Sequence, residues 1–126
     1  MKEIKAYFNR SCVNRVVDEL EKTGALGISI AEIHPVGYGY EPNYFEIQFG
    51  DAYKRYAYLR IIKLEVVCAD HDVARMVQAI RNGCWSGSKD DGWIFITNVE
   101  TGFRICDCAS GEEVVAQERE PLLART

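Results

Sequence analysis

The sequence predicts an α+β domain in which two helices cover one face of an antiparallel sheet. Two segments place apolar residues at i, i+3, i+4 and i+7, the spacing of one helical stripe. The stripes are Val13, Val16, Val17 and Leu20, and Val73, Met76, Val77 and Ile80. Strand-like segments flank each stripe, so the chain reads β-α-β, long loop, β-α-β. The simplest fold with this order is the ferredoxin-like split βαβ plan (βαββαβ) with right-handed crossovers.

Length and composition fit one globular domain. The 126 residues are 48% hydrophobic and 27% charged, which excludes a disordered chain. A net charge of −4 argues against nucleic acid as the main partner. No apolar run approaches the roughly 18–20 residues of a membrane helix, and the first residues lack a signal-peptide core. Five irregularly spaced cysteines do not suggest a secreted disulfide framework. We therefore expect a cytoplasmic protein.

The first βαβ unit is predicted over residues 2–36. Residues 2–8 alternate in polarity like a half-buried strand. Ser11 is the expected N-cap of the helix, since its hydroxyl can satisfy a free helix N–H. Gly24 is the expected C′ residue that ends the helix, and a second strand follows over residues 27–36.

The second unit begins with a nearly continuous apolar strand over residues 58–68. Asp70 or Asp72 is expected to cap the helix that follows, and Asn82-Gly83 to end it. The last strands are predicted at residues 93–99 and, as a short fifth strand, 103–106.

Two helices on one face leave the other face of the sheet uncovered. The strand at 58–68 has few polar residues, so a partner subunit is its natural cover. The domain is expected to span residues 1–108. Residues 109–126 are polar, and acidic up to Pro121, which predicts a flexible C-terminal tail.

Residues 37–56 are rich in glycine and other turn residues, and six of the seven tyrosines lie between Tyr38 and Tyr58. A loop of this length inside a compact domain is usually functional. The sequence is equally consistent with a β-hairpin extension in which the aromatic rings pack on one another. That shape does not exclude a binding role.

Several segments follow one another in the order and spacing of one protein family. They are residues 1–6 (MKEIKA), 27–33 (GISIAEI), 36–39 (VGYG), 63–67 (KLEVV), 86–96 (SGSKDDGWIFI) and 103–105 (FRI). Over about residues 1–106 the chain thus resembles the PII nitrogen-regulatory signalling proteins.

The resemblance implies a homotrimer with nucleotide clefts between subunits and a long T-loop between the second and third strands. It implies a sensor that controls a transporter, enzyme or regulator, and contact with a membrane only through a transporter partner. No convincing nucleophile–base pair or pair of carboxylates suggests an enzyme. The divergent relatives tied to inorganic carbon uptake, which respond to AMP, ADP or bicarbonate, are the most specific resemblance.

A nucleotide cleft needs backbone N–H groups to hold phosphates and cations to balance them. The segment 86–92 can supply the N–H groups, and the strand at 63–67 would line the adenine pocket beside Ser29. The resemblance assigns these residues to the cleft: Ser29, Gly37, Tyr38, Glu65, Val66, Val67, Gly87, Lys89, Asp91, Gly92, Trp93 and Arg104.

Two family cations are missing from this cleft. Trp93 stands in place of a lysine and Cys106 in place of a second arginine, while Arg104 is kept; Asp90 replaces a glycine, and Lys89 partly compensates. Each charge-assisted hydrogen bond contributes roughly 1.5–3 kcal/mol, so two losses weaken binding by about 10²–10⁴. We therefore expect AMP or ADP to bind in preference to ATP, and the alternative is a degenerate site that binds no nucleotide.

The long loop also departs from the family pattern. Tyr53 is the nearest match to a modifiable tyrosine, although its flanking residues favour a packing role. Gly39 stands where the family has a glutamine that helps bind magnesium and 2-oxoglutarate, so 2-oxoglutarate sensing is not expected. The aromatic residues expected to contact a partner are Tyr40, Tyr44, Phe45, Phe49 and Tyr53.

Cys106 and Cys108 form the one close cysteine pair. A disulfide between them would close a small, strained ring that is easily reduced, as in a redox switch, and two free thiols are the favoured alternative. Zinc needs about four ligands; Cys84 and His71 could join the pair, but no second tight pair exists, so no metal site is predicted. A metal- or redox-responsive module on the same trimeric fold is the alternative function.

Overall fold

The computed structural model describes residues 1–35, 60–89 and 91–116 of the chain. Its elements are β1 (Lys2–Asn9), the 3₁₀ turn η1 (Arg10–Cys12), α1 (Val13–Lys22), β2 (Ser29–Ile33), β3 (Ile61–Cys68), the 3₁₀ turn η2 (Asp70–Asp72), α4 (Val73–Cys84), β4 (Gly92–Asn98) and α5 (Glu113–Ala116).

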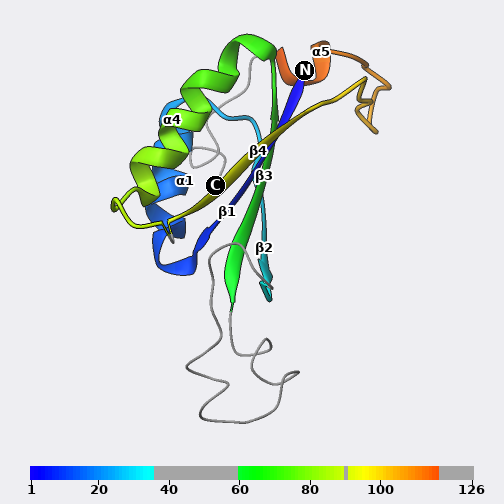
Figure 1. Ribbon diagram of the computed structural model, residues 1–126. Coiled ribbons are helices and arrows are strands. Elements are labelled where there is room, and N and C mark those ends of the chain that lie inside the picture. Colours follow the sequence, from blue (N-terminus) through cyan, green and yellow to red (C-terminus); the bar gives the residue numbers. More distant parts are fainter. Residues whose placement is uncertain (36–59, 90, 117–126) are drawn as a thin grey trace.

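The four strands form one antiparallel sheet in the order β2-β3-β1-β4. Ala6 at its centre pairs with Leu64 of β3 and with Ile94 of β4. Figure 1 shows α1 and α4 together on one side of this sheet. The α+β architecture, with a ferredoxin-like sheet and two helices on one face, is therefore confirmed.

The core lies between the helices and the sheet. Alternate residues of β1 (Ile4, Ala6 and Phe8) point toward the helices and are buried. They meet Val16 and Leu20 of α1, and α4 contributes Met76 and Ile80 to the same cluster. Both predicted helical stripes thus provide the apolar faces that hold this layer together.

The expected ends of the helices need three corrections. Asn9, not Ser11, provides the first cap, because its side chain accepts a hydrogen bond from the Ser11 N–H at 2.9 Å. Neither Asp70 nor Asp72 caps α4 through its side chain. A 3₁₀ turn precedes both α1 and α4. The Val13 N–H donates to the carbonyl of Arg10 and the Val73 N–H to that of Asp70, so the backbone satisfies N–H groups that a side chain would otherwise cap. Gly24, at φ +80°, is confirmed as the residue that ends α1.

The third correction concerns Gly83, which lies inside α4 and does not end it. A Cβ atom at this position would come within 2.7 Å of the Cα of Val16. Glycine is therefore required by the close approach of α4 to α1, and the helix continues to Cys84.

The fifth strand predicted at residues 103–106 is wrong. The segment is one side of a turn that closes by a single bridge between Phe103 and Ser110. The Arg104 N–H donates to the carbonyl of Ala109 at 2.8 Å, and Cys108 turns the chain with a φ of +59°. We call residues 102–111 the C-terminal turn.

Residues 109–116, predicted as the start of a flexible tail, pack against the domain. Val114 and Val115 of α5 are half-buried beside β3. A carboxylate oxygen of Glu112 also lies 3.6 Å from the amino group of Met1.

The register of the strands identifies the open face of the sheet. Glu3, Lys5 and Tyr7 alternate with the core residues of β1, so they point away from the helices. Their cross-strand partners Val67, Glu65 and Lys63 lie on the same face. Among the described residues, α5 covers one end of this face; the predicted partner subunit remains an expectation.

Several predicted residues lie outside the described ranges: Gly37, Tyr38, Gly39, Tyr40, Tyr44, Phe45, Phe49, Tyr53 and Asp90. Within the described ranges, none of the helices combines the length and apolar character needed to cross a bilayer.

Candidate functional site

The loop between α4 and β4, called here the 85–91 loop, is described at residues 85–89 and 91. Its described residues fold around the carboxylate of Asp91. That carboxylate accepts hydrogen bonds from the N–H of Ser86 at 2.7 Å and of Gly87 at 3.0 Å. The Ser86 hydroxyl donates to its other oxygen. These hydrogen bonds favour the ionised form and hold the pKa of Asp91 below its usual value. Asp91 therefore acts as an internal anion that fixes the shape of the loop.

Gly92 joins this loop to β4 at a position that only glycine can occupy. Its φ is +131°, and a Cβ atom there would lie 2.0 Å from the carbonyl oxygen of Tyr7. The first residue of β4 is thus pressed against β1, which brings the loop to the edge of the sheet.

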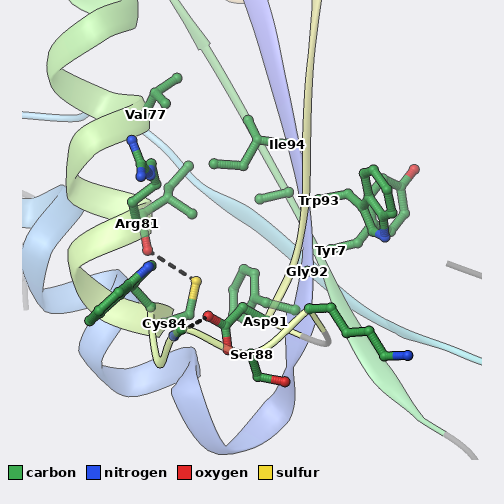
Figure 2. A pocket seen from close by; sticks show the side chains of 15 residues that line it. Tyr7, Val77, Arg81, Cys84, Ser88, Asp91, Gly92, Trp93 and Ile94 are labelled. Carbon is green, nitrogen blue, oxygen red and sulfur yellow. Dashed lines mark hydrogen bonds between the residues drawn. The ribbon is translucent and has the colours of Figure 1, made fainter. Parts of the chain in front are cut away.

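A cavity of about 630 Å³ opens between this loop, the C-terminal end of α4 and the start of β4. Figure 2 shows Arg81, Cys84, Ser88 and Asp91 around it, with Val77 and Ile94 farther along its wall. Five predicted site residues line this cavity: Gly87, Lys89, Asp91, Gly92 and Trp93.

The sequence reasoning did not assign Tyr7, Arg81 or Trp85 to a site, and it considered Cys84 only as a possible zinc ligand. All four residues line the cavity. Arg81 supplies a cation from α4, one helical turn before the loop. Of these residues, only Trp85 could have been identified from the sequence, because it is a large apolar residue beside a polar, glycine-containing loop.

Cys84 is a neutral thiol at this cavity. Its sulfur donates a hydrogen bond to the carbonyl of Ile80 at 3.1 Å. Burial raises its pKa to about 11, because a thiolate would be poorly solvated there. It is therefore not poised as a nucleophile or a metal ligand at neutral pH.

Trp93 lies on the open face of the sheet, where it offers an aromatic surface in place of a positive charge. Its ring is nearly parallel to that of Phe95, with centroids 6.4 Å apart. Tyr7 meets Phe95 edge-on at 6.0 Å. Figure 2 shows Trp93 beside Tyr7, across β4 from Val77 and Arg81. Because 47% of Trp93 remains exposed, the indole can stack on a flat ring but cannot neutralise a phosphate.

The other predicted strand residues line a second cavity of about 260 Å³, formed with α5. They are Ser29, Glu65, Val66 and Val67. Ser29 pairs directly with Glu65 across β2 and β3. The Glu65 carboxylate accepts from the Lys63 ammonium at 2.9 Å, which lowers the pKa of Glu65. Among the described residues, none lines both this cavity and the one at the 85–91 loop.

Arg104 belongs to neither cavity. It lies in the C-terminal turn, and its guanidinium donates to both carboxylate oxygens of Asp107, at 2.8 and 2.7 Å. This pair lowers the pKa of Asp107 to about 2. The seven residues of β4 separate Arg104 from the 85–91 loop, which corresponds to about 20 Å of strand. The structure therefore does not bring Arg104 to the loop of its own chain.

Cys106 and Cys108, in the same turn, are exposed free thiols. In the described part of the chain, no group of three or more His, Cys, Asp or Glu side chains is arranged to hold a metal ion.

Comparisons with known proteins agree on one family. The family model for nitrogen regulatory protein P-II matches residues 1–107. The chain is 32% identical over 115 residues to a nitrogen regulatory protein P-II of Rhizobium meliloti (strain 1021), and 34% identical over 115 residues to one of Cereibacter sphaeroides. Each alignment covers 91% of this chain and 100% of the relative. A relative named nitrogen regulatory protein P-II from Haemophilus influenzae is 33% identical over 113 residues, 90% of this chain and 96% of its own.

Members of this family are signal-transduction regulators, not enzymes, and they act through partner proteins. The family match runs through all four strands and through α1 and α4, and it ends at Asp107, before α5. The chain belongs to the nitrogen regulatory protein P-II family.

Proposed function

We propose that this protein is a cytoplasmic PII-like regulator that binds an adenine nucleotide between the subunits of a homotrimer. AMP or ADP binds in preference to ATP, and the occupied protein controls a transporter, enzyme or regulator through residues 37–56. Inorganic carbon or nitrogen metabolism is the proposed setting.

Apart from Arg104, the described residues assigned to the nucleotide site line two separate cavities, and this observation supports a site between subunits. The 85–91 loop, with Gly87, Asp91 and Gly92, lines one cavity, whereas Ser29 and Glu65 line another. This separation supports a ligand that contacts the 85–91 loop of one copy of the chain and the strand residues of another.

The preference for fewer phosphates follows from the charges at the 85–91 loop. Lys89 and Arg81 are the described cations that line this cavity. Trp93 adds apolar surface where a lysine would add charge, and Arg104 already pairs with Asp107. This half of the site offers aromatic surface, but it is poorly equipped to balance the charge of a triphosphate.

Calorimetric titration with AMP, ADP and ATP, with and without bicarbonate, tests the proposal. In W93K a lysine replaces the indole, so ATP affinity should rise by about 10- to 100-fold, the effect of one charge-assisted interaction. AMP affinity should change less. I105K is the matched control, because Ile105 is 99% exposed and lines neither cavity, so its substitution adds the same charge away from the site.

Tighter binding of AMP or ADP than of ATP by the wild-type protein supports the proposal, and light scattering should give the mass of three chains. No heat with any nucleotide, from the wild-type protein and W93K alike, overturns nucleotide binding. A monomer in the presence of saturating nucleotide overturns the inter-subunit site.

A further inference from the structure

The short helix α5 forms one wall of the cavity in which the proposed function places the base of the nucleotide. Val114 and Val115 line it together with Ser29, Glu65 and Val67. Figure 1 shows α5 at the end of the sheet where β3 finishes, close to the N-terminus. The two valines thus narrow the space beside the strand residues that would receive an adenine ring.

The C-terminal turn holds α5 in this place. The Gly111 N–H donates to the carbonyl of Gly102 at 3.0 Å, which closes the turn. The Val114 N–H then donates to the carbonyl of Gly111 at 3.1 Å, so the first residues of α5 are joined directly to the turn. The carboxylate of Glu112, 3.6 Å from the Met1 amine, adds a contact to the start of β1.

The same segment also neutralises Arg104. Asp107 accepts two hydrogen bonds from the guanidinium, whose side chain is mostly buried. The hydrogen bond with Asp107 is the main cause of the raised pKa of Arg104. The negative charge of Glu113 raises this pKa further, so a second carboxylate lies close enough to act on the guanidinium. A phosphate that approached Arg104 would have to displace Asp107 and would meet the negative charge of Glu113.

We propose that residues 107–116 are a built-in competitor that closes this half of the nucleotide site until a ligand displaces them. Val114 and Val115 narrow the place of the base, and Asp107 occupies the place of a phosphate on Arg104. The inference rests on the proposed function and adds to it a contact within one chain that opposes binding. A phosphate can pair with Arg104 only after the Asp107 contact breaks. The competitor therefore weakens most the nucleotides whose phosphates reach Arg104, and we expect these to be ADP and ATP rather than AMP.

Two full-length variants test the two halves of this competitor. V114S/V115S removes apolar contacts of α5, so its affinity for AMP, ADP and ATP should rise by about tenfold. D107N removes the charge that holds Arg104, so ADP and ATP should gain about tenfold while AMP gains little. I105S is the matched control, because Ile105 lies in the same turn, is 99% exposed and lines neither cavity.

Hydrogen exchange supplies a readout that does not depend on nucleotide. Residues 63–67 and 113–116 should exchange faster in V114S/V115S than in the wild type or I105S; equal exchange overturns the proposed contact. If the wild type binds and V114S/V115S binds equally or more weakly, α5 is not a competitor, although the proposed function stands. If the wild type and all variants bind no nucleotide, both proposals fail.

Discussion

Gly83→Ala is expected to destabilise the protein although alanine is the better helix former. The new Cβ would lie 2.7 Å from both the Cα and Cγ2 of Val16 and 2.8 Å from its backbone nitrogen. Ordinary carbon contacts begin near 3.4 Å. Because two of these three atoms are backbone, α1 and α4 would have to move apart by about 0.7 Å to restore normal packing.

The free energy of unfolding should fall by about 2 kcal/mol. Overpacking costs about 1–3 kcal/mol, and the contact with backbone atoms places this site near the upper end. Replacing a helical glycine with alanine offsets about 1 kcal/mol. Unfolding entropy of about 2.1 cal/mol/K per residue, over 126 residues, converts this loss into a fall of about 8 °C in Tm.

Thermal and urea unfolding followed by circular dichroism, at one protein concentration, measures this change. Gly27→Ala is the control, because a Cβ at Gly27 meets no atom within 4 Å; its Tm should stay within about 2 °C of the wild type. A Gly83→Ala protein as stable as the wild type, or more stable, would refute the argument from helix contact.

Three further predictions concern the loop, the turn and the cysteines. Asp91→Ala should speed hydrogen exchange at Ser86 and Gly87, whose N–H groups lose their acceptor; unchanged exchange would mean that another group fixes the loop. The pKa of Asp107 is about 2, below the ordinary carboxyl value, so its pairing with Arg104 stabilises the turn above pH 4 and is lost as the pH falls through about 2. Carboxyl-carbon NMR titration checks this, and a midpoint near pH 4 contradicts it. Iodoacetamide at pH 7.5 should alkylate Cys106 and Cys108 long before Cys84, whose pKa is about 11 and whose thiol is partly buried; equal rates by mass spectrometry would contradict the assigned burial.

The central elements of the fold could be predicted because each repeats a pattern over many residues. The core contains apolar residues from the stripes of α1 and α4. It also contains the apolar residues that alternate with polar ones along β1. The caps and Gly83 could not be predicted, because they depend on a 3₁₀ turn and on a contact with a second helix. The helix α5, Glu113–Ala116, is too short to show a periodicity, and only its packing distinguishes it from a polar tail.

At the site, the sequence could identify residues that are neighbours in the chain. The residues Gly87, Lys89 and Asp91 to Trp93 reach one cavity because they form one loop and the strand start beside it. Tyr7 was missed because its position depends on the register between β1 and β4. Arg104 was assigned through the resemblance to a cleft between subunits. Within one chain β4 separates it from the 85–91 loop, so its place in such a cleft stays a prediction.

The placement of Trp85 and Trp93 has a practical consequence for fluorescence. They are the two tryptophans of the chain, and both border the cavity at the 85–91 loop. Their exposed fractions of 69% and 47% leave both indoles in contact with water. The intrinsic tryptophan emission of this protein therefore originates at the rim of a single cavity, and its colour and intensity report on that cavity without any added label.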